Sequence, residues 1–484
     1  MAKMFIAGES TGSSSGQTYD VINPATGEVV DSAPKGTESD VRAAIDAAHA
    51  AFQSWSETAA EARAQLIVKG IDTVKKELPD LAALLTKEQG KPLGDSQREI
   101  EHFLHGMNFY AGLASKIRGS YVPLPDNKMY GMVLKQPVGV TGAIVPWNFP
   151  ITLMGTKVGP ALAAGCTVVV KPASTTPLTT TRIVELLNQA GLPKGVLNVV
   201  TGEGPTAGRA IVESMQVDKV AFTGGTETGR EVLKGVATSN LKKVSLELGG
   251  KSPNIFFSDA DLDAAADGAL FGIFINQGEV CSAGSRILVQ QDLFKTFVGR
   301  MKEMLPRIVL GNPLNRNTKM GPLVSEEHLE KVEDYIAIGR KEAKLVAGGR
   351  RPSSKELKNG YFVEPTIFES DNKARIAREE IFGPVVACIP FKDEDDALQI
   401  ANDTPYGLAA AVWSRDIFKC LRIVKNLRAG IVWVNTMQPC YVESPWGGYK
   451  QSGHGRELSL HGIEEFLETK QVHINLSERP IGWY

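Results

Sequence analysis

The feature that most constrains the fold is an alternation of strand and helix patterns between residues 138 and 250. Buried strands are predicted at Thr167–Val170, Val196–Val200 and Lys219–Phe222, which are short, apolar and rich in valine. Helical patterns follow them at residues 179–190, 206–213 and 228–236. Strands that alternate with helices in this rhythm form right-handed βαβ units and a parallel sheet. The region therefore predicts a Rossmann-like α/β domain, on which dinucleotides bind at the carboxyl ends of the strands.

A second α/β alternation begins at Pro253. Its candidate strands include Pro253–Phe257, Arg286–Val289 and Gly430–Val434, so we expect a second α/β domain. Two extended segments, Tyr121–Lys135 and Leu467–Asn475, lie outside both alternations. We expect these segments to be β-arms that pair with another subunit.

Near the N-terminus, apolar residues recur at helical spacing over residues 39–52. Thr37 stands just before this stretch, with Asp40 three residues further on. A hydroxyl followed by an acid at that spacing is typical of a capping box. We therefore expect a capped helix to begin at Thr37.

Composition and charge exclude several classes of protein. The net charge of −2, from 53 basic and 55 acidic residues, favours neither nucleic acid nor an anionic membrane as a partner. No window approaches the roughly 18 apolar residues that span a bilayer, and the first residues have too short an apolar stretch for a signal peptide. The five cysteines are odd in number and far apart, unlike a disulfide framework. A reduced, cytoplasmic location fits best.

A glycine-rich turn, Phe222–Gly229, lies between a predicted strand and a predicted helix. Glycines such as Gly225 and Gly229 let the backbone approach a diphosphate, and the helix N-terminus offers unpaired N–H groups. A lone turn of this kind is often only structural, but its place among three βαβ-like units favours cofactor binding. Lys171 follows the strand Thr167–Val170 at the same sheet edge. It is either a solvated lysine or a donor to the adenosine ribose or its phosphate.

Cys281 is the candidate nucleophile, in the segment Asn276–Ser285. Most single cysteines are inert small hydrophobic residues, but polar and small neighbours are not those of a packed core. The thiolate is the reactive form, so the site must lower the thiol pKa or supply a base. None of the seven histidines lies nearby in the sequence, which weakens a Cys–His hydrolase interpretation.

Two further side chains could support chemistry at a thiol. Glu247 stands on an apolar strand, either facing solvent or in a dry pocket that raises its carboxyl pKa towards that of a useful base. Asn148 lies between two prolines, and a fixed amide donor suits a developing oxyanion, although a cap or turn role is commoner. His102 and His105 share helical spacing without further ligands, so we expect no metal site.

These motifs together resemble the aldehyde dehydrogenases over nearly the whole chain, from Asn23–Gly27 to Gly462–Phe466. They occur in the family's order, with Glu380–Pro384 and Ser444–Lys450 downstream. Several independent segments in one order are far more specific than any one of them. The resemblance implies oxidation of an aldehyde to the carboxylic acid with NAD or NADP, through a thiohemiacetal and a thioester on Cys281.

The resemblance also implies roles for single residues. Cys281 corresponds to the nucleophile, Glu247 to the base that activates water, and Asn148, with the backbone N–H of Cys281, to the oxyanion donor. Glu247 also argues against the branch of the family that acylates coenzyme A. The residues implied in cofactor binding are Trp147, Lys171, Ser174, Gly225, Gly229, Glu380 and Phe382, the Glu380 and Phe382 pair holding the nicotinamide ribose.

Two positions depart from the usual family pattern. Members that prefer NAD usually carry Glu three residues after the lysine, where this chain has Ser174. Serine removes a charge that would repel a 2′-phosphate, so we expect NADP to be tolerated, and a preference for NADP over NAD stays open. The usual Gln two residues before the nucleophile is Glu279 here. A carboxylate that faced the thiol would oppose its ionisation, so we expect Glu279 to point away or to pair with a cation.

The segment that contains Trp446 and Gln451–Glu457 is similar to that of bacterial betaine aldehyde dehydrogenases. Aromatic faces bind their quaternary ammonium substrate by cation–π attraction. Phe149 and Trp446 correspond to two walls of that aromatic box, but Thr156 and Ile275 occupy the other two positions. The sequence leaves open betaine aldehyde or a smaller aliphatic or hydroxylated aldehyde.

We expect residues 1–119 and 138–249 to form the dinucleotide-binding domain and residues 250–448 the catalytic domain. Residues 120–137 and 466–484 are like the family's oligomerisation arms and imply a homodimer or homotetramer. The alternatives are a catalytically silent binding protein of the same fold and a cysteine hydrolase without redox chemistry. The combination of Cys281, Glu247 and Asn148 opposes the first, and the cofactor motifs oppose the second.

Overall fold

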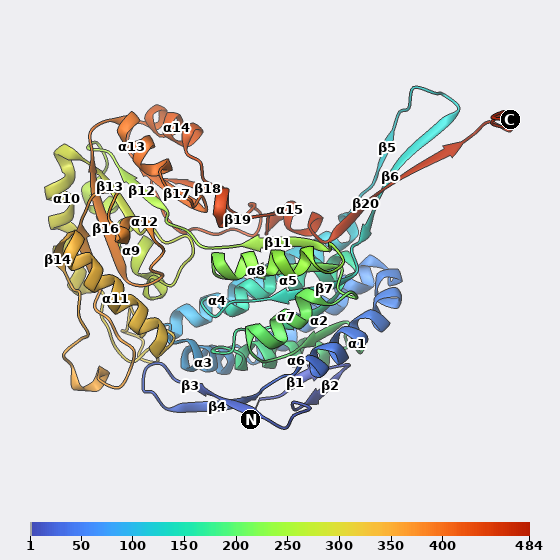
Figure 1. The fold of residues 1–484 in the computed structure, drawn as a ribbon, viewed down its shortest axis with the longest axis horizontal. Coiled ribbons are helices and arrows are strands. Elements are labelled where there is room, and N and C mark those ends of the chain that lie inside the picture. The colour runs from blue at the N-terminus through green and yellow to red at the C-terminus, as the bar shows by residue number, and fades with distance from the viewer. Residues whose placement is uncertain (1) are drawn as a thin grey trace.

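The computed structural model describes residues 2–484 and contains two large sheets and a projecting arm (Figure 1). The first sheet has eight strands, and its five central strands run parallel. In spatial order the strands are β19 (Gly453–His454), β11 (Lys243–Glu247), β10 (Lys219–Thr223), β7 (Val140–Ile144), β8 (Thr167–Lys171), β9 (Leu197–Val199), β1 (Met4–Ile6) and β2 (Glu9–Thr11). The predicted parallel α/β sheet is confirmed, and every residue of β7, β8, β9 and β10 is buried.

Helices cover both faces of this sheet (Figure 1). They are α1 (Glu38–Glu57), α2 (Ala60–Lys76), α3 (Leu78–Gln89), α4 (Leu93–Leu113), α5 (Pro150–Ala164), α6 (Leu178–Gln189), α7 (Arg209–Glu213) and α8 (Thr226–Ala237). The predicted capping box of α1 is confirmed, because the Asp40 N–H donates to Thr37 and the Thr37 N–H donates to Asp40. The α-helix predicted over residues 206–213 is shorter than expected. It begins at Arg209, and a π-helical turn at Gly204–Gly208 precedes it.

The second sheet has seven strands, and only its first pair is antiparallel. In spatial order they are β14 (Lys344–Ala347), β15 (Thr366–Glu369), β16 (Val385–Phe391), β13 (Arg286–Gln290), β12 (Pro253–Phe256), β17 (Ala409–Trp413) and β18 (Ile431–Val434). Its helices are α9 (Leu262–Phe274), α10 (Gln291–Met304), α11 (Glu326–Glu342), α12 (Arg375–Arg378), α13 (Glu394–Asn402) and α14 (Ile417–Asn426). The chain then returns to the first sheet through β19 and through α15 (Ser459–Glu464), which contacts α5.

The arm is a three-stranded antiparallel sheet that extends away from the rest of the molecule (Figure 1). Its strands are β5 (Ser120–Val122), β6 (Met129–Pro137) and β20 (Leu467–Asn475), and all nine residues of β20 pair with β6. A separate hairpin joins β3 (Thr18–Ile22) to β4 (Val29–Pro34). Within residues 2–484, no helix combines the length and apolar character that crossing a membrane requires.

The loop that carries Trp446 packs tightly against the start of β18. A Cβ built on Gly430 would lie 1.8 Å from the carbonyl oxygen of Gly447. Because both partners are backbone, a side chain at Gly430 must displace one segment from the other. Gly430→Ala should therefore lower the free energy of unfolding by about 1–3 kcal/mol, measured by urea denaturation.

Gly299→Ala is the matched control for this prediction. Gly299 lies inside α10, and its added Cβ would meet nothing within 4 Å. Alanine is the better helix former, so this variant should be as stable as the parent protein or more stable. Equal stability of the two variants would contradict the close packing at Gly430.

Candidate active site

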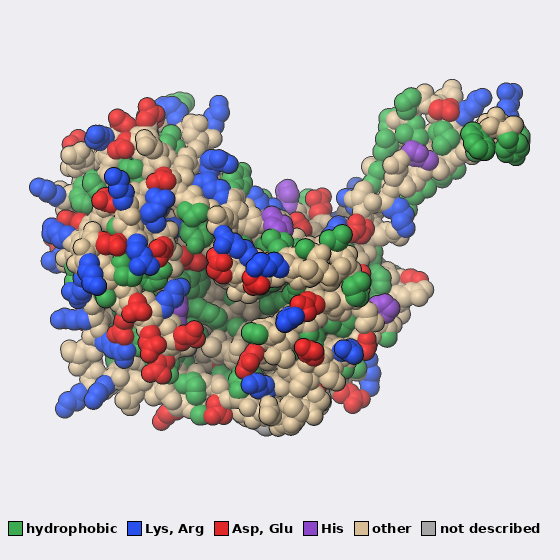
Figure 2. Space-filling view, in the orientation of Figure 1, with side chains coloured by type: hydrophobic (Ala, Val, Ile, Leu, Met, Phe, Trp, Pro, Cys, Tyr) green, Lys and Arg blue, Asp and Glu red, His purple; other side chains and the backbone are tan. Residues whose placement is uncertain are grey.

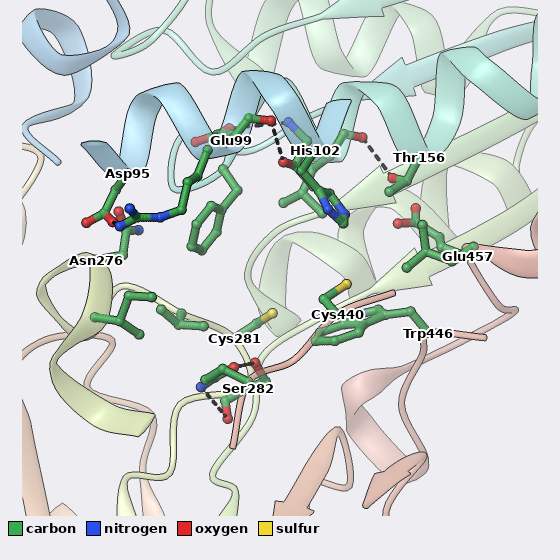
Figure 3. Close-up of a pocket in the computed structure, with 18 residues that line it drawn as sticks. Asp95, Glu99, His102, Thr156, Asn276, Cys281, Ser282, Cys440, Trp446 and Glu457 are labelled. Carbon is green, nitrogen blue, oxygen red and sulfur yellow. Dashed lines mark hydrogen bonds and ion pairs between the residues drawn. The ribbon is translucent and has the colours of Figure 1, made fainter. Parts of the chain in front are cut away.

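Cys281 lies on the loop between α9 and β13, and its thiol opens into a cavity of about 310 Å³ (Figure 3). The four residues predicted for the substrate pocket, Phe149, Thr156, Ile275 and Trp446, all line this cavity. Other side chains around it come from α4, α5, the loops of the second sheet and the segment between β19 and α15. They are Asp95, Arg98, Glu99, His102, Thr152, Leu153, Asn276, Val280, Ser282, Gln438, Cys440, Glu457 and Leu458.

The surroundings of Cys281 disfavour its ionised form. Burial raises the pKa of the thiol well above the ordinary value, and the carboxylates of Glu247 and Glu380 raise it further. The backbone N–H of Ser282 acts in the opposite direction but does not offset these effects. The resting thiol is therefore neutral at physiological pH, and a nucleophilic role requires a base to remove its proton.

Glu247 is the last residue of β11 and is 4% exposed. Its Oε2 has no hydrogen-bond partner. Burial raises the pKa of this carboxyl well above its ordinary value, and the carboxylate of Glu457 raises it further, against the opposing charge of Lys157. Glu247 does not line the cavity itself, whereas Glu457 does. A buried carboxyl whose pKa is shifted upward has the strength that general-base chemistry near neutral pH needs.

Lys157 and Glu457 were not identified from the sequence as site residues. Lys157 Nζ lies 2.6 Å from Glu457 Oε1 and donates to Thr223 Oγ1 at 2.7 Å. The pair is buried at the carboxyl end of the first sheet and contributes the charges around Glu247. A lysine inside the otherwise apolar stretch of α5 is the sequence signal that could have identified it.

Asn148 lies in the loop between β7 and α5 and is 3% exposed. Its backbone oxygen accepts from Lys91 Nζ at 2.6 Å and from Asn276 Nδ2 at 3.2 Å. Its side-chain Nδ2 donates to the backbone oxygen of Glu279 at 3.0 Å. An amide nitrogen carries two hydrogens, so one hydrogen of Asn148 remains for a further acceptor.

The glycine-rich turn leads from β10 into α8. Gly225 is the N-cap of α8, no side chain caps that helix, and a Cβ at Gly225 would meet nothing within 4 Å. Space and free N–H donors for a diphosphate are therefore present. Gly229 serves packing instead, since a Cβ there would lie 2.7 Å from Leu248 Cδ2.

Lys171 ends β8, and its Nζ donates to the backbone oxygen of Pro172 at 2.7 Å. Burial lowers the pKa of Lys171 to about 8. Ser174 follows in a turn and is half-buried. Lys171 lies at the carboxyl end of β8 and Ser174 just after it, where a parallel sheet binds nucleotides.

Three of the residues predicted to bind the cofactor, Trp147, Glu380 and Phe382, are held by contacts with His328 or Gly250 or with one another. Trp147 and Phe382 meet edge to face with ring centroids 5.3 Å apart, and His328 packs against Trp147 at 5.2 Å. Phe382 has a left-handed backbone, with φ of 63°, and its oxygen lies 2.7 Å from His328 Nε2. Glu380 Oε1 accepts from the Gly250 N–H at 2.9 Å. His328 was not identified from the sequence, because it belongs to no recognisable motif.

Glu279 points away from the thiol, as expected from the sequence. Its Oε1 accepts from the Val324 N–H at 2.9 Å and its Oε2 accepts from Gln89 Nε2 at 3.0 Å. The side chain is fully buried and does not line the cavity. Burial raises the pKa of this carboxyl, whereas the Val324 N–H and the Lys91 charge lower it.

His102 and His105 do not form a metal centre. His102 lines the cavity, whereas His105 lies 3.6 Å from Glu443 on the surface. Within residues 2–484, no three His, Cys, Asp or Glu side chains come together in a way that could hold a metal ion.

Comparisons with known proteins identify the family of this chain. The model of the aldehyde dehydrogenase family matches residues 11–472. The betaine aldehyde dehydrogenase of Bacillus subtilis is 44% identical, with 99% of each chain covered, and aldehyde dehydrogenase 1A1 of Mesocricetus auratus is 44% identical, with 99% of this chain and 95% of the relative covered. The Staphylococcus aureus betaine aldehyde dehydrogenase, solved in complex with NAD+, has a TM-score of 0.98 at 42% identity over 100% of this chain and 97% of that one.

A putative aldehyde dehydrogenase from Burkholderia cenocepacia has the same fold, with a TM-score of 0.98 at 40% identity over 100% of this chain and 99% of that one. The chain belongs to the aldehyde dehydrogenase family. It is an NAD(P)-dependent enzyme that oxidises an aldehyde through a cysteine.

Labelling tests the electrostatics of the thiol. Because burial and two carboxylates raise the pKa of Cys281, the pH midpoint of its alkylation by iodoacetamide in the free protein should lie above 9.0. Mass spectrometry measures each cysteine separately, and Cys440, whose pKa burial raises to about 12, is the comparison in the same cavity. A midpoint at or below the roughly 8.5 of an unperturbed thiol would contradict this account.

Proposed function

We propose that Cys281 is the nucleophile, Glu247 the general base and Asn148 the oxyanion donor of this aldehyde dehydrogenase. The observation that carries the proposal is the position of Cys281. Its thiol opens into a cavity that Phe149 and Trp446 also line. The buried carboxyl of Glu247 raises the thiol pKa, which is the effect of a nearby acidic group, and Asn148 retains a free amide hydrogen.

The steps follow from these positions. Glu247 accepts the thiol proton, the sulfur attacks the carbonyl carbon, and the carbonyl oxygen gains the charge of an oxyanion. The remaining hydrogen of Asn148 and the backbone N–H of Cys281 stabilise that charge. NAD(P)+, when bound, accepts the hydride that leaves the carbon. Glu247 releases the thiol proton to solvent and then takes a proton from water, the hydroxide attacks the thioester, and Cys281 departs as a thiolate.

We propose the cofactor contacts as a set. The N-terminus of α8 at Gly225 holds the diphosphate, with Gly229 giving the close packing behind it. Lys171 and Ser174 contact the adenosine ribose, while Glu380, Phe382 and Trp147 hold the nicotinamide ribose. Because Ser174 carries no charge to repel a 2′-phosphate, the enzyme accepts both NAD and NADP.

The cavity supports a neutral aldehyde of modest size as substrate. Ile275 and Thr156 line the cavity where a complete aromatic box would have two more rings, and Lys91 Nζ already lies 4.1 Å from the centroid of the Phe149 ring. A buried ammonium on that ring weakens its attraction for a second cation. Betaine aldehyde is the second candidate, because Phe149 and Trp446 both face the cavity and two relatives carry that name.

We propose the division into domains expected from the sequence, with one addition. Residues 1–119 and 138–249 form the dinucleotide-binding domain, and residues 250–448 form the catalytic domain. The segment 449–465 belongs with the first sheet, because β19 pairs with β11 and α15 contacts α5. A reduced cytoplasmic location is supported by five cysteines that are all free thiols.

We also propose that the arm, residues 120–137 and 466–484, joins copies of this chain into a homodimer or homotetramer. Its strands expose large hydrophobic side chains, among them Tyr121, Tyr130, Leu134 and Ile474 (Figure 2). A three-stranded sheet with no hydrophobic core packed against it is only marginally stable by itself. An exposed patch of large hydrophobic side chains on such a sheet is typical of a surface that another protein chain covers. A second copy that covers it would remove these side chains from water.

An absorbance assay tests the catalytic proposal. Aldehyde-dependent formation of NADH or NADPH at 340 nm should occur with a panel of small neutral aldehydes and betaine aldehyde, with both cofactors run in parallel. Cys281→Ser should lower kcat by at least about a thousandfold, because the weaker hydroxyl nucleophile is not activated at this site. Reduced cofactor formed at an undiminished rate by Cys281→Ser would exclude the mechanism.

Each competing hypothesis has its own outcome in this assay. No reduced cofactor with any aldehyde would favour a silent binding protein. Hydrolysis of a thioester without any cofactor reduction would favour a cysteine hydrolase. A higher kcat/KM for betaine aldehyde than for every neutral aldehyde would reverse our choice of substrate.

Light scattering after gel filtration tests the arm. The parent protein should elute with the mass of two or four chains. Leu134→Glu with Ile474→Glu should shift it to a single chain, because two charges would be buried in the contact. The control is Leu233→Glu on α8, an exposed leucine outside the arm, which should leave the mass unchanged. A parent protein of single-chain mass would refute the proposal.

A further inference from the structure

Glu279 contacts Asn148 through its main chain, and its side chain does not line the cavity into which the thiol opens. The backbone oxygen of Glu279 accepts from Asn148 Nδ2 at 3.0 Å and from Asn276 Nδ2 at 3.2 Å. Its side chain is anchored at both oxygens, one by Gln89 and one by the N–H of Val324. One residue therefore fixes the amide of Asn148 through its main chain and ties that main chain to the end of α3 and to the loop before α11.

The loop that contains Glu279 requires such an anchor. Asn276 and Gln277 have left-handed backbone conformations, with φ of 49° and 59°. Non-glycine residues in this region persist only where the surroundings hold them. Gln277 Oε1 is itself held weakly, 3.3 Å from the N–H of Gly321. The two shorter contacts of the Glu279 carboxyl, at 2.9 and 3.0 Å, are the stronger constraint on the path of the loop.

Two donors to Glu279 have a fixed direction, and the side chain of Gln277 is a third hydrogen-bonding group beside this carboxyl. The N–H of Val324 is a backbone group and can only donate. Gln89 cannot exchange its oxygen and nitrogen, because its Oε1 already accepts from the backbone N–H of Lys91 at 2.9 Å. Position 279 must therefore accept at two atoms. A carboxyl group does so in either protonation state, whereas the nitrogen of a glutamine amide can only donate.

We propose that Glu279 is a positioning residue for Asn148, selected at this position by the two donors that face it. This inference rests on the role proposed above for Asn148. Glu279→Gln sets one N–H against another, so the side chain turns and carries its backbone oxygen away from Asn148. His328 Nε2, 3.9 Å from Oε1, and the Lys91 ammonium are the charged or titratable groups that also face this carboxyl.

Two exchanges of acid and amide test the proposal. Glu279→Gln should lower kcat by about tenfold or more, a fraction of the 10²–10³ that loss of an oxyanion donor costs. Gln89→Glu alone places two carboxyls together and should also lower kcat. The double exchange Gln89→Glu with Glu279→Gln restores one acceptor for each donor and should return kcat to within about threefold of the parent value. A double variant no faster than Glu279→Gln would overturn the proposal.

A double-variant experiment tests whether Glu279 affects kcat through Asn148. If Glu279 acts through that amide, adding Glu279→Gln to Asn148→Ala should cost no further kcat, because the donor is already absent. Additive losses would overturn the proposal. The measured thiol pKa of Cys281 should change by less than one unit in Glu279→Gln, and a larger fall would show that the carboxyl acts on the sulfur instead.

Glu88→Gln is the matched control. Glu88 precedes Gln89 in the chain, is fully buried, and accepts from the N–H groups of Leu178 and Thr179 at 2.7 and 2.9 Å. Like Glu279, it is a buried carboxyl that accepts from two donors, but it has no hydrogen bond to Asn148. Its loss in thermal stability should match that of Glu279→Gln while kcat stays unchanged. An equal fall in kcat for Glu88→Gln would reduce the effect at Glu279 to general destabilisation and overturn the proposal.

Should Glu279→Gln fail to fold, Gln89→Met replaces it in the same scheme. Methionine removes one of the two donors to Glu279 and leaves the carboxyl in place, so Gln89→Met should lower kcat by less than Asn148→Ala does. Combining Gln89→Met with Asn148→Ala should lower kcat no further than Asn148→Ala alone. A parent enzyme that forms no reduced cofactor, or an Asn148→Ala variant of full activity, would refute the proposed function itself rather than this inference.

Discussion

Charge pairing inside the protein is the constraint on which the site depends. Lys91 and Lys157 are completely enclosed, and a buried ammonium costs several kcal/mol unless it is paired and hydrogen-bonded. Lys91 lies 2.5 Å from Glu99 and Lys157 lies 2.6 Å from Glu457. Each lysine also donates to a third group, the backbone oxygen of Asn148 or the hydroxyl of Thr223. These contacts join α4 and α5 to the ends of β7 and β10.

The same burial sets the resting state of the chemistry. The Cys281 thiol and the Glu247 carboxyl both have raised pKa values, and each owes most of its shift to the loss of water. The thiol is therefore neutral in the free protein near neutral pH, and reaction begins with a proton transfer to a base rather than from a preformed thiolate. The site differs in this respect from cysteine enzymes that rely on a neighbouring imidazolium. None of the seven histidines is needed to account for the proposed steps.

Local patterns predicted the parallel sheets because buried strands of this kind consist almost entirely of apolar residues. The strands expected at Thr167–Val170 and Lys219–Phe222 match β8 and β10 to within one residue. The π-helical turn at Gly204–Gly208 was not predicted, because a π-helical turn has no characteristic residue pattern and depends on how the segment packs in the fold. Lys157 and Glu457 were missed for a similar reason. They are 300 residues apart in the chain, and only the fold brings them together.

Glu279 replaces the Gln that is usual in the family, and the effect of this replacement depends on the groups that contact the carboxyl in the fold. In the sequence, the carboxyl was a potential obstacle to thiol ionisation, because it stands two residues before Cys281. In the fold, the thiol opens into the cavity while the carboxyl faces Gln89 and the N–H of Val324. Position 279 is therefore constrained by the need to accept two hydrogen bonds, and not by the effect of its charge on the Cys281 thiol. Because the Glu279 oxygen holds Asn148, the choice of acid or amide at this position acts on the oxyanion donor.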